Sequence, residues 1–261
     1  MNAHPPLYAD EELQRYARHI VLREIGGPGQ ARLKRARVLV IGAGGLGAPV
    51  LMYLAAAGVG QIAVVDDDVV SVSNLQRQVI HAEDRIGMAK VRSAQIAVAG
   101  INPYVRLVPV EDRLDAAKAA ALVPGQDLVI DATDDMETRH MLNAACVAAR
   151  VPLLSGAISQ WEGQMTLYDP AHDAPCLACL FPVIPPAELL PTCAAAGVMG
   201  ALPGIIGSMM AAEAIKELTG AGRTLRGRLV IQDVLWGENR EIAVSRRAGC
   251  PVCGHIHKED A

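Results

Sequence analysis

Four of the six cysteines form two C-x-x-C pairs, Cys176 with Cys179 and Cys250 with Cys253. Each pair supplies two thiolates at a spacing that a tetrahedral zinc ion accepts, and four thiolates complete a closed, structural Zn²⁺ site. Redox-active dithiols and free thiols are the alternatives, and two such pairs in a cytosolic chain favour zinc over both. His255 and His257 could compete as ligands, but we expect them to be tail residues.

A glycine-rich loop, Gly42-Ala43-Gly44-Gly45-Leu46-Gly47, follows an apolar run and opens a helical segment, so it fits G-x-G-x-x-G in its required context. Its glycines permit a tight turn and let a phosphate approach the free N–H groups of the helix start. Asp66 ends the next apolar run, 19 residues after Gly47, where an acid normally binds ribose hydroxyls. A tight turn in a ligand-free protein is the alternative, but these features together favour a nucleotide. The loop does not distinguish NAD from ATP.

The residues that follow Asp66 favour a phosphate chain over a neutral nicotinamide. They are Ser73, Asn74, Leu75, Gln76, Arg77 and Gln78, with Lys90 at the start of a later helix. Asp134 and Asp135 follow another apolar run, at the carboxyl edge where doubly wound sheets bind ligands. This pair could hold Mg²⁺ on phosphates, or either acid could cap the helix near Glu137, and the residue pattern leaves both roles open.

Three further residues could carry chemistry. Cys193 lies in a proline-flanked loop before an apolar helix, where a buried, inert thiol is the ordinary expectation. Cys146 lies among alanines in a helical segment, so we expect it in the core. His81 is the histidine nearest the glycine loop, and we expect it to have a structural or surface role.

The elements that must position these residues alternate between short apolar runs and helical segments. Strands are expected at 38–41, 62–65, 105–108, 128–130 and 152–154, and helices at 46–57, 90–99, 116–123 and 137–149. This pattern predicts an α/β fold with a Rossmann-like doubly wound parallel sheet, covered on both faces. A first helix is expected with Asp10 as its N-cap and with Leu13, Tyr16 and Ile20 on its apolar face.

After Ser155 the pattern changes to alternating, half-exposed strands at 163–168, 228–232 and 241–244, with a buried helix at 204–218. We interpret these as an antiparallel extension of the same sheet. The chain 1–261 is therefore expected to be one domain. It would have a helical arm (1–35), a nucleotide-binding half (36–155) and a second half (156–261) that carries the zinc site.

The composition excludes several classes of protein. The 261 residues have a net charge of −4 and are 3% aromatic, so we expect neither an extended phosphate-binding surface nor a stacking platform for nucleic acid. No apolar stretch follows a basic start, and the uncharged stretch 189–212 is interrupted by Pro191, Pro203 and four glycines. We therefore expect a cytoplasmic protein without a secretory signal and without a membrane partner.

These residues together resemble the MoeB/ThiF (HesA/MoeB/ThiF) family, the bacterial adenylyltransferases related to ubiquitin-activating enzymes. The segment Ser-Asn-Leu-Gln-Arg-Gln at this distance from a G-x-G-G-x-G loop is highly specific. The resemblance covers nearly the whole chain, through the segments 15–20, 42–47, 53–60, 73–78, 102–103, 162–164, 175–176 and 193–198, together with Gly156.

The resemblance implies that ATP lies over Gly45, with Asp66 on the ribose and with Asn74, Arg77 and Lys90 on the triphosphate. The implied reaction is attack on the α-phosphate by the C-terminal glycine carboxylate of a ubiquitin-like sulfur carrier protein ending in Gly-Gly. An acyl-adenylate and pyrophosphate would be the products. Residues 156–261 would then be the carrier-binding half.

The resemblance also implies roles for residues outside this set. Asp134 would support Mg²⁺, and Arg18 would reach the triphosphate of the neighbouring subunit in a homodimer. Cys193 stands where relatives carry a cysteine that in some of them forms a thioester or acyl-disulfide with the carrier and in others is dispensable. Asp135 departs from the family, which usually has Asn there, so its role is left open.

Two questions stay open at this point. The carrier could serve molybdopterin, thiamine or another sulfur pathway, and no rhodanese-like domain follows Ala261, so we expect a separate sulfur donor. An NAD-dependent oxidoreductase and a zinc-stabilised dimeric scaffold that binds nucleotide without turnover are the alternative functions.

Overall fold

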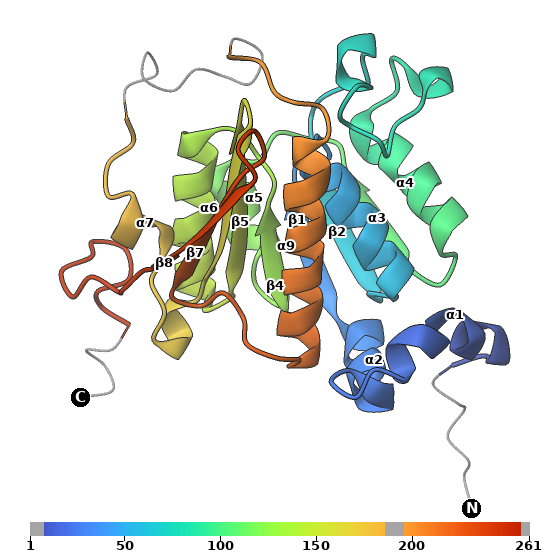
Figure 1. The fold of residues 1–261 in the computed structure, drawn as a ribbon, viewed down its shortest axis with the longest axis horizontal. Helices are drawn as coiled ribbons and strands as arrows, with labels where there is room; N and C mark the ends of the chain where they lie inside the picture. Colours follow the sequence, from blue (N-terminus) through green and yellow to red (C-terminus); the bar gives the residue numbers. More distant parts are fainter. Residues whose placement is uncertain (1–7, 186–195, 257–261) are drawn as a thin grey trace, which may run out of the picture.

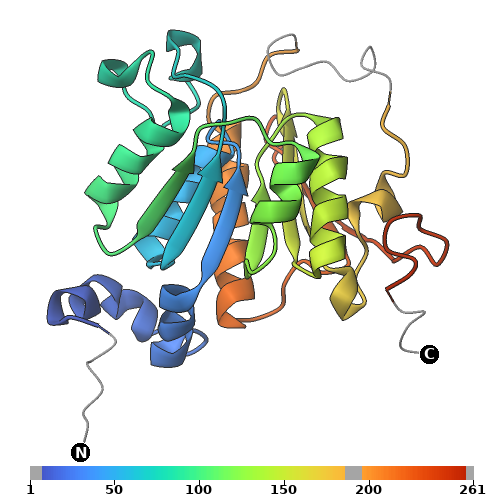
Figure 2. The ribbon, with the colours of Figure 1, turned by 180° about the vertical axis from the view of Figure 1, so that it is seen from behind.

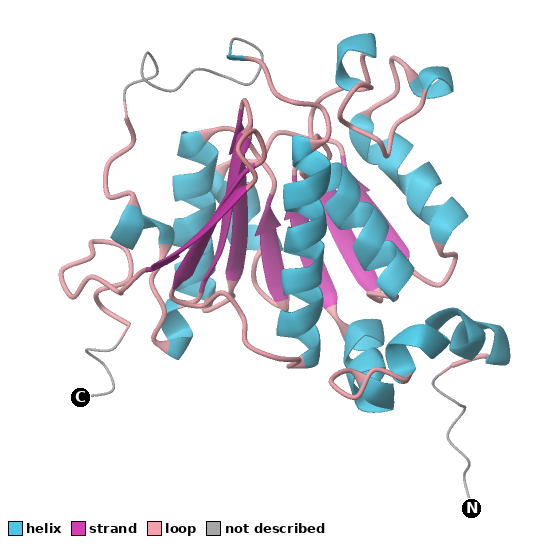
Figure 3. Cartoon of the chain, in the orientation of Figure 1, coloured by secondary structure: helices cyan, strands magenta, loops and turns pink. Residues whose placement is uncertain are grey.

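The computed structural model describes residues 8–185 and 196–256, which form one mixed sheet of eight strands in the order β3-β2-β1-β4-β5-β6-β7-β8 (Figure 1, Figure 3). The strands are β1 (Arg37–Ile41), β2 (Gln61–Val65), β3 (Arg106–Val110), β4 (Leu128–Asp131), β5 (Leu153–Ser159), β6 (Glu162–Tyr168), β7 (Arg228–Asp233) and β8 (Glu238–Ala243). The main helices are α1 (Asp10–Ile20), α2 (Gly26–Arg35), α3 (Gly47–Ala57), α4 (Lys90–Ile101), α5 (Ala116–Leu122), α6 (Met136–Ala149), α7 (Leu177–Leu180) and α9 (Leu202–Thr219).

The central parallel strands β1, β2 and β4 are buried on both faces, as their continuous apolar runs predict, whereas the edge strand β3 is half-buried. In β1, Val38 and Val40 pack into the core formed with α3, α4 and α9, whereas Leu39 and Ile41 pack into the core formed with α5 and α6. The two opposite views show these helix groups on the two faces of the sheet (Figure 1, Figure 2). Cys146 is 2% exposed in the second core, which confirms the packing role expected for it.

The path of the chain creates a switch point in the sheet. From β1 the chain runs outward to β2 and β3, and it then crosses to β4 and β5 on the other side of β1. The carboxyl ends of β1 and β4 are neighbours, with Ile41 opposite Asp131. Because the connections leave these two strands in opposite directions, a crevice opens between them, which is where open α/β sheets bind ligands.

The antiparallel extension is confirmed: β6 pairs antiparallel with β5, and β7 and β8 follow in the same sense. Its outer strand β8 is exposed throughout and begins at Glu238, three residues before the expected start at 241. The strand expected at 152–154 continues to Ser159 as β5, five residues beyond its expected end, and the expected boundaries of the remaining predicted elements lie within two residues of the observed ones. Among the described helices, none combines the length and the apolar character needed to cross a bilayer.

The N-terminal arm differs from its prediction. Ala9 occupies the N-cap position without a side-chain bond, and Asp10 is the first helical residue, so the predicted cap is wrong. Leu13 is 42% exposed, whereas Tyr16 is buried and its hydroxyl accepts a 2.8 Å hydrogen bond from the Asn102 side chain. The helix α2 was not predicted, because its first four residues include three glycines and a proline, which disfavour a helix.

The contact of Tyr16 with Gly58 predicts that a methyl group added at Gly58 destabilises the fold more than one added at Gly87. Gly58 has φ of 82°, and a Cβ there would lie 2.4 Å from the Tyr16 ring, whereas Gly87 has φ of 85° and open space around it. Gly87→Ala should therefore cost about 1 kcal/mol of unfolding free energy from backbone strain alone. Gly58→Ala should cost about 2–4 kcal/mol, because overpacking adds to the strain. Urea unfolding of both variants measures the difference, and equal losses would contradict the role of the Tyr16 contact.

Candidate functional site

A cavity of about 850 Å³ opens at the carboxyl ends of β1, β2 and β4 and extends along β5 and β6 toward α7. It brings together eleven of the residues singled out in the sequence: Gly42, Gly44, Gly45, Leu46, Asp66, Asn74, Arg77, Gln78, Lys90, Asp134 and Asp135. Other described candidates do not line it, namely Arg18, Gly47, Ser73, Leu75 and Gln76. Cys193 lies outside the described residues.

The glycine loop is held in place by its backbone and presents free donors. Gly42 has φ of 96°, and a Cβ there would lie 2.8 Å from a carbonyl oxygen after β4, so only glycine fits. The Asp66 carboxylate accepts a 2.7 Å hydrogen bond from the Ala43 N–H, and burial raises the pKa of Asp66. Within the described part of the chain, the N–H groups of Gly44 and Gly45 have no partner. They are donors of the kind that bind anions at helix starts.

Two cations line the same cavity. Lys90 is 5% exposed at the first turn of α4, and its Nζ lies 2.6 Å from an Asp68 carboxylate oxygen. Arg77 is half-buried and donates to the Ser73 carbonyl at 2.9 Å. Ser73 therefore acts through its backbone, by orienting Arg77. The buried Gln78 Oε1 has no partner among the described residues, so a polar acceptor beside these cations is left for a ligand or water.

The two acids after β4 differ in what they contact. The Asp135 carboxylate caps α6 by accepting hydrogen bonds from the N–H groups of Glu137 and Thr138, at 3.3 and 2.8 Å, and from the Thr138 hydroxyl at 2.5 Å. Burial acts to raise the pKa of Asp135, but these hydrogen bonds outweigh it and hold that pKa below its ordinary value. Asp134 is exposed and has no hydrogen bond in the described structure. Its carboxylate oxygens fit the ligand preference of Mg²⁺.

A buried ion pair lies under the loop that carries these acids. Asp131 is fully buried, and its Oδ2 lies 3.6 Å from the Arg139 Nε and accepts a 2.7 Å hydrogen bond from the Ser155 hydroxyl. Arg139 also donates to the carbonyl groups of Thr133 and Gly156. These contacts join the loop after β4 to strand β5. Sequence reasoning missed them, because no spacing rule pairs a strand end with an arginine on the following helix.

Arg18 lies far from the cavity of its own chain. Its side chain is exposed on α1. Helix α1 lies near the amino-terminal ends of the parallel strands, and the cavity opens at their carboxyl ends (Figure 1). Any contact of Arg18 with a ligand in such a cavity would therefore require a second copy of the chain.

The four paired cysteines form one cluster. The Sγ atoms are 3.9 Å apart for Cys176 and Cys179, 3.6 Å for Cys176 and Cys250, and 3.5 Å for Cys179 and Cys253. A tetrahedral zinc with Zn–S bonds of about 2.3 Å needs sulfurs about 3.8 Å apart. All four sulfurs lie within 4.8 Å of one another, so they fit a structural zinc site. His255 is exposed and is not part of this cluster, as expected.

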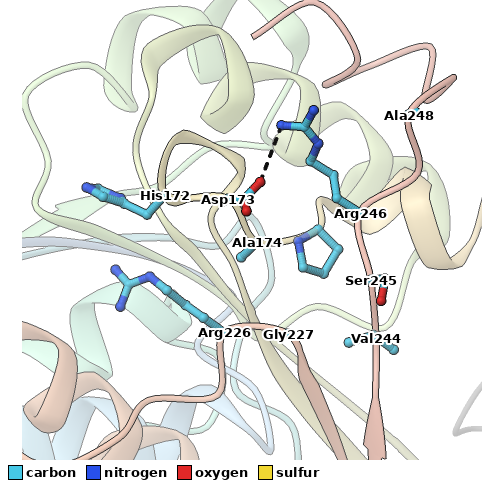
Figure 4. Close-up of a pocket in the computed structure, with 10 residues that line it drawn as sticks. His172, Asp173, Ala174, Arg226, Gly227, Val244, Ser245, Arg246 and Ala248 are labelled. Carbon is cyan, nitrogen blue, oxygen red and sulfur yellow. Dashed lines mark ion pairs between the residues drawn. The ribbon is translucent and has the colours of Figure 1, made fainter. Parts of the chain in front are cut away.

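A second hollow, of about 600 Å³, lies beside the cysteine cluster, between the segment before α7 and the segment after β8 (Figure 4). Its cations are neutralised by acids of the same chain. Arg226 lies 2.7 Å from both Asp169 and Glu217, and Arg246 lies 3.8 Å from Asp173. Because these charges are already paired, the larger cavity is the better candidate for binding an anionic ligand.

The model of the ThiF family matches residues 16–252. That match covers most of the chain, from the arm through the glycine loop to Cys250, the first member of the second cysteine pair. The chain belongs to the ThiF family.

Several ThiF-family relatives are similar over nearly their full length. The "SAMP-activating enzyme E1" of Haloferax volcanii is 48% identical, over 93% of this chain and 89% of the relative. The "Sulfur carrier protein adenylyltransferase" of Thermus thermophilus is 46% identical, over 95% and 93%. The "Molybdopterin-synthase adenylyltransferase" of Escherichia coli is 46% identical, over 94% and 98%.

Solved structures show the same fold at lower identity. The crystal structure of E. coli MccB with AMPCPP and MccA superposes with a TM-score of 0.84, over 93% of this chain and 74% of that chain, at 22% identity. The crystal structure of PaaA superposes with a TM-score of 0.79 at 21% identity. At this identity the likeness shows the ThiF-type fold alone.

The cap formed by Asp135 predicts a pH-dependent stability. Asp135→Ala should lower the unfolding free energy by about 1 kcal/mol at neutral pH, whereas Asp135→Asn, which keeps an acceptor, should lose less. Because the folded-state pKa is depressed, the carboxylate stabilises the fold above its unfolded pKa, and this contribution is lost as the pH falls through the folded pKa. The difference in unfolding free energy between the wild type and Asp135→Asn should therefore become smaller as the pH falls. Urea unfolding across this pH range measures it, and a constant difference would contradict the role of the charge.

The cysteine cluster predicts that the amount of zinc bound per chain depends on the four clustered cysteines and not on Cys146. Cys253→Ser should lower both the zinc bound per chain and the Tm, because the metal holds the end of the chain to the segment at α7. Cys146→Ala is the control, since Cys146 is buried outside the cluster and its loss leaves only a small cavity. Elemental analysis and thermal unfolding measure the two effects. Equal zinc content in both variants would contradict the metal centre.

Proposed function

We propose that this ThiF-family protein uses ATP to adenylate the C-terminal glycine carboxylate of a ubiquitin-like sulfur carrier protein. The observation that carries the proposal is one continuous cavity, with free N–H groups, Arg77 and Lys90 at one end and a groove along β5 and β6 at the other. ATP would occupy the first end, and an extended carrier tail ending in Gly-Gly would enter through the groove. The names of the three curated relatives, each 89% or more covered, support this reaction.

The charges in the cavity suit this chemistry. The carrier carboxylate is already ionised at neutral pH, so it needs no general base. One of its oxygens bonds to the α-phosphorus, the bond from that phosphorus to the bridging oxygen breaks, and pyrophosphate leaves with the electron pair. Arg77, Lys90 and the free N–H groups would offset the negative charge that gathers at the phosphates. Asp134 would hold Mg²⁺, which neutralises phosphate charge when bound.

The nucleotide contacts follow from the same geometry. The Asp66 carboxylate lies at the end of β2, where it both holds the glycine loop and would bind the ribose hydroxyls. Asn74 lines the cavity beside Arg77 and would contact the triphosphate. Asp66 therefore has a structural contact within the chain as well as a proposed ligand contact, whereas Asn74 has the proposed ligand contact.

The partners of the reaction are part of the proposal. A homodimer would let the exposed Arg18 of one copy reach the triphosphate in the other, because its own cavity is out of reach. A covalent role for Cys193 and a separate sulfur-donor protein are proposals that rest on the family resemblance. The pathway served by the carrier, molybdopterin, thiamine or another, would follow from which carrier reacts.

The proposal predicts carrier-dependent ATP–pyrophosphate exchange. Arg77→Ala and Lys90→Ala should each lower its kcat/KM by about 100-fold, ~2.7 kcal/mol of transition-state stabilisation, with little change in Tm. Arg92→Ala is the matched control. Arg92 is an exposed cation of α4, the helix that also carries Lys90, and it pairs with Glu111 at 3.7 Å outside the cavity. It should stay within about twofold of wild type.

The same measurement separates the alternative functions. Exchange with a carrier ending in Gly-Gly supports the adenylyltransferase. Hydride transfer with NAD, and no exchange, would identify an oxidoreductase instead. ATP binding without either reaction would identify a scaffold. Unchanged exchange in Arg77→Ala and Lys90→Ala would show that the triphosphate lies elsewhere.

A further inference from the structure

His81 joins the glycine loop to α4 through both of its ring nitrogens. It is 6% exposed, its Nε2 lies 2.9 Å from the Ala43 carbonyl oxygen, and its Nδ1 lies 2.8 Å from the Ser93 hydroxyl. A carbonyl only accepts, so Nε2 carries the proton and Nδ1 accepts from Ser93. Burial lowers the pKa of His81, and the charges of Lys90 and Arg85 lower it further, so the neutral ring is favoured at neutral pH.

The hydrogen bond to Ala43 determines where the next N–H points. In a trans peptide the C=O and the following N–H point in opposite directions, and the described chain has no cis peptide. By holding the Ala43 carbonyl toward α4, His81 turns the Gly44 N–H to the opposite side. Gly44 lines the cavity, and its N–H has no partner in the described structure. On the other side of Ala43, Asp66 binds the preceding N–H, so two successive peptide groups are held.

We propose that His81 is a positioning residue for the triphosphate, which acts by holding the Ala43 carbonyl so that the Gly44 N–H points at a phosphate oxygen. His81 does not touch the nucleotide. Its second bond, to Ser93, fixes the tautomer that this role requires and anchors the ring to the helix that begins with Lys90. The inference rests on the proposed function for the identity of the nucleotide, ATP.

Two substitutions separate this role from simple filling of the core. The amide nitrogen of Gln reaches close to the position of the imidazole Nε2, so His81→Gln keeps a donor for the Ala43 carbonyl. The amide of Asn reaches close to Nδ1 instead, so His81→Asn keeps a group near Ser93 and leaves the carbonyl without a donor. If His81 only filled space in the core, both substitutions should lower ATP affinity to a similar extent.

The test is the affinity of the purified full chain for ATP and for adenosine, measured by calorimetry without a carrier. His81→Asn should raise the Kd for ATP by about tenfold, ~1.4 kcal/mol, and leave the Kd for adenosine unchanged, because only the phosphate contact is lost. His81→Gln should stay within about twofold of wild type for both ligands. Equal losses in the two variants, or equal losses for ATP and adenosine, would overturn the proposal.

A measurement on the wild-type chain keeps the proposal testable if the variants unfold. Hydrogen exchange of the Gly44 amide, followed by NMR, should slow on addition of ATP and should not slow on addition of adenosine. Unchanged exchange of that amide in saturating ATP would overturn the role of His81. If no carrier supports pyrophosphate exchange but these patterns hold, the proposed function fails while the positioning role of His81 stands.

Discussion

The structure depends on one constraint, which is that five parallel strands covered by helices on both faces must present their carboxyl ends at a single edge. Parallel strands need crossover connections, and here helices on both faces provide them. The glycine loop after β1, Asp66 after β2 and Asp134 after β4 are distant in the sequence, yet the register of the sheet brings them into one cavity. Their proximity is a consequence of topology.

Buried polar contacts give this edge its shape. Each has its partners close by: Asp66 and His81 hold the glycine loop, and the pair of Asp131 and Arg139 holds the loop after β4. Opening one of these contacts would leave a buried polar group without a partner, which costs free energy. The contacts therefore keep the loops in fixed positions. The free donors of Gly44 and Gly45 are therefore presented by backbone that is itself constrained, which is the preorganisation that charge stabilisation requires.

The antiparallel extension and the segment at α7 line the other part of the cavity. The groove runs along strands β5 and β6, and Leu177 of α7 also lines it. Cys176, immediately before α7, lies in the cluster with Cys250, so the cluster joins the C-terminal part of the chain to the segment that lines the groove. A metal at this cluster would therefore act on the groove through the position of α7.

Local patterns in the sequence predicted most of this protein. Apolar runs and their spacing determined the strands, the order of elements and the fold class, because burial on both faces leaves a signal in each short segment. The glycine loop, the acid at the end of β2 and the paired cysteines were also recognisable, since each needs particular residue types at a short fixed spacing. The tertiary structure alone decided which of two acids caps α6 and that α1 starts one residue earlier than predicted. It also decided that His81 contacts a carbonyl group of the glycine loop and that Arg139 contacts one of strand β5. The contacts of His81 and Arg139 join segments that are far apart in the chain, and no spacing rule in the sequence encodes a distance that only the folding of the sheet creates.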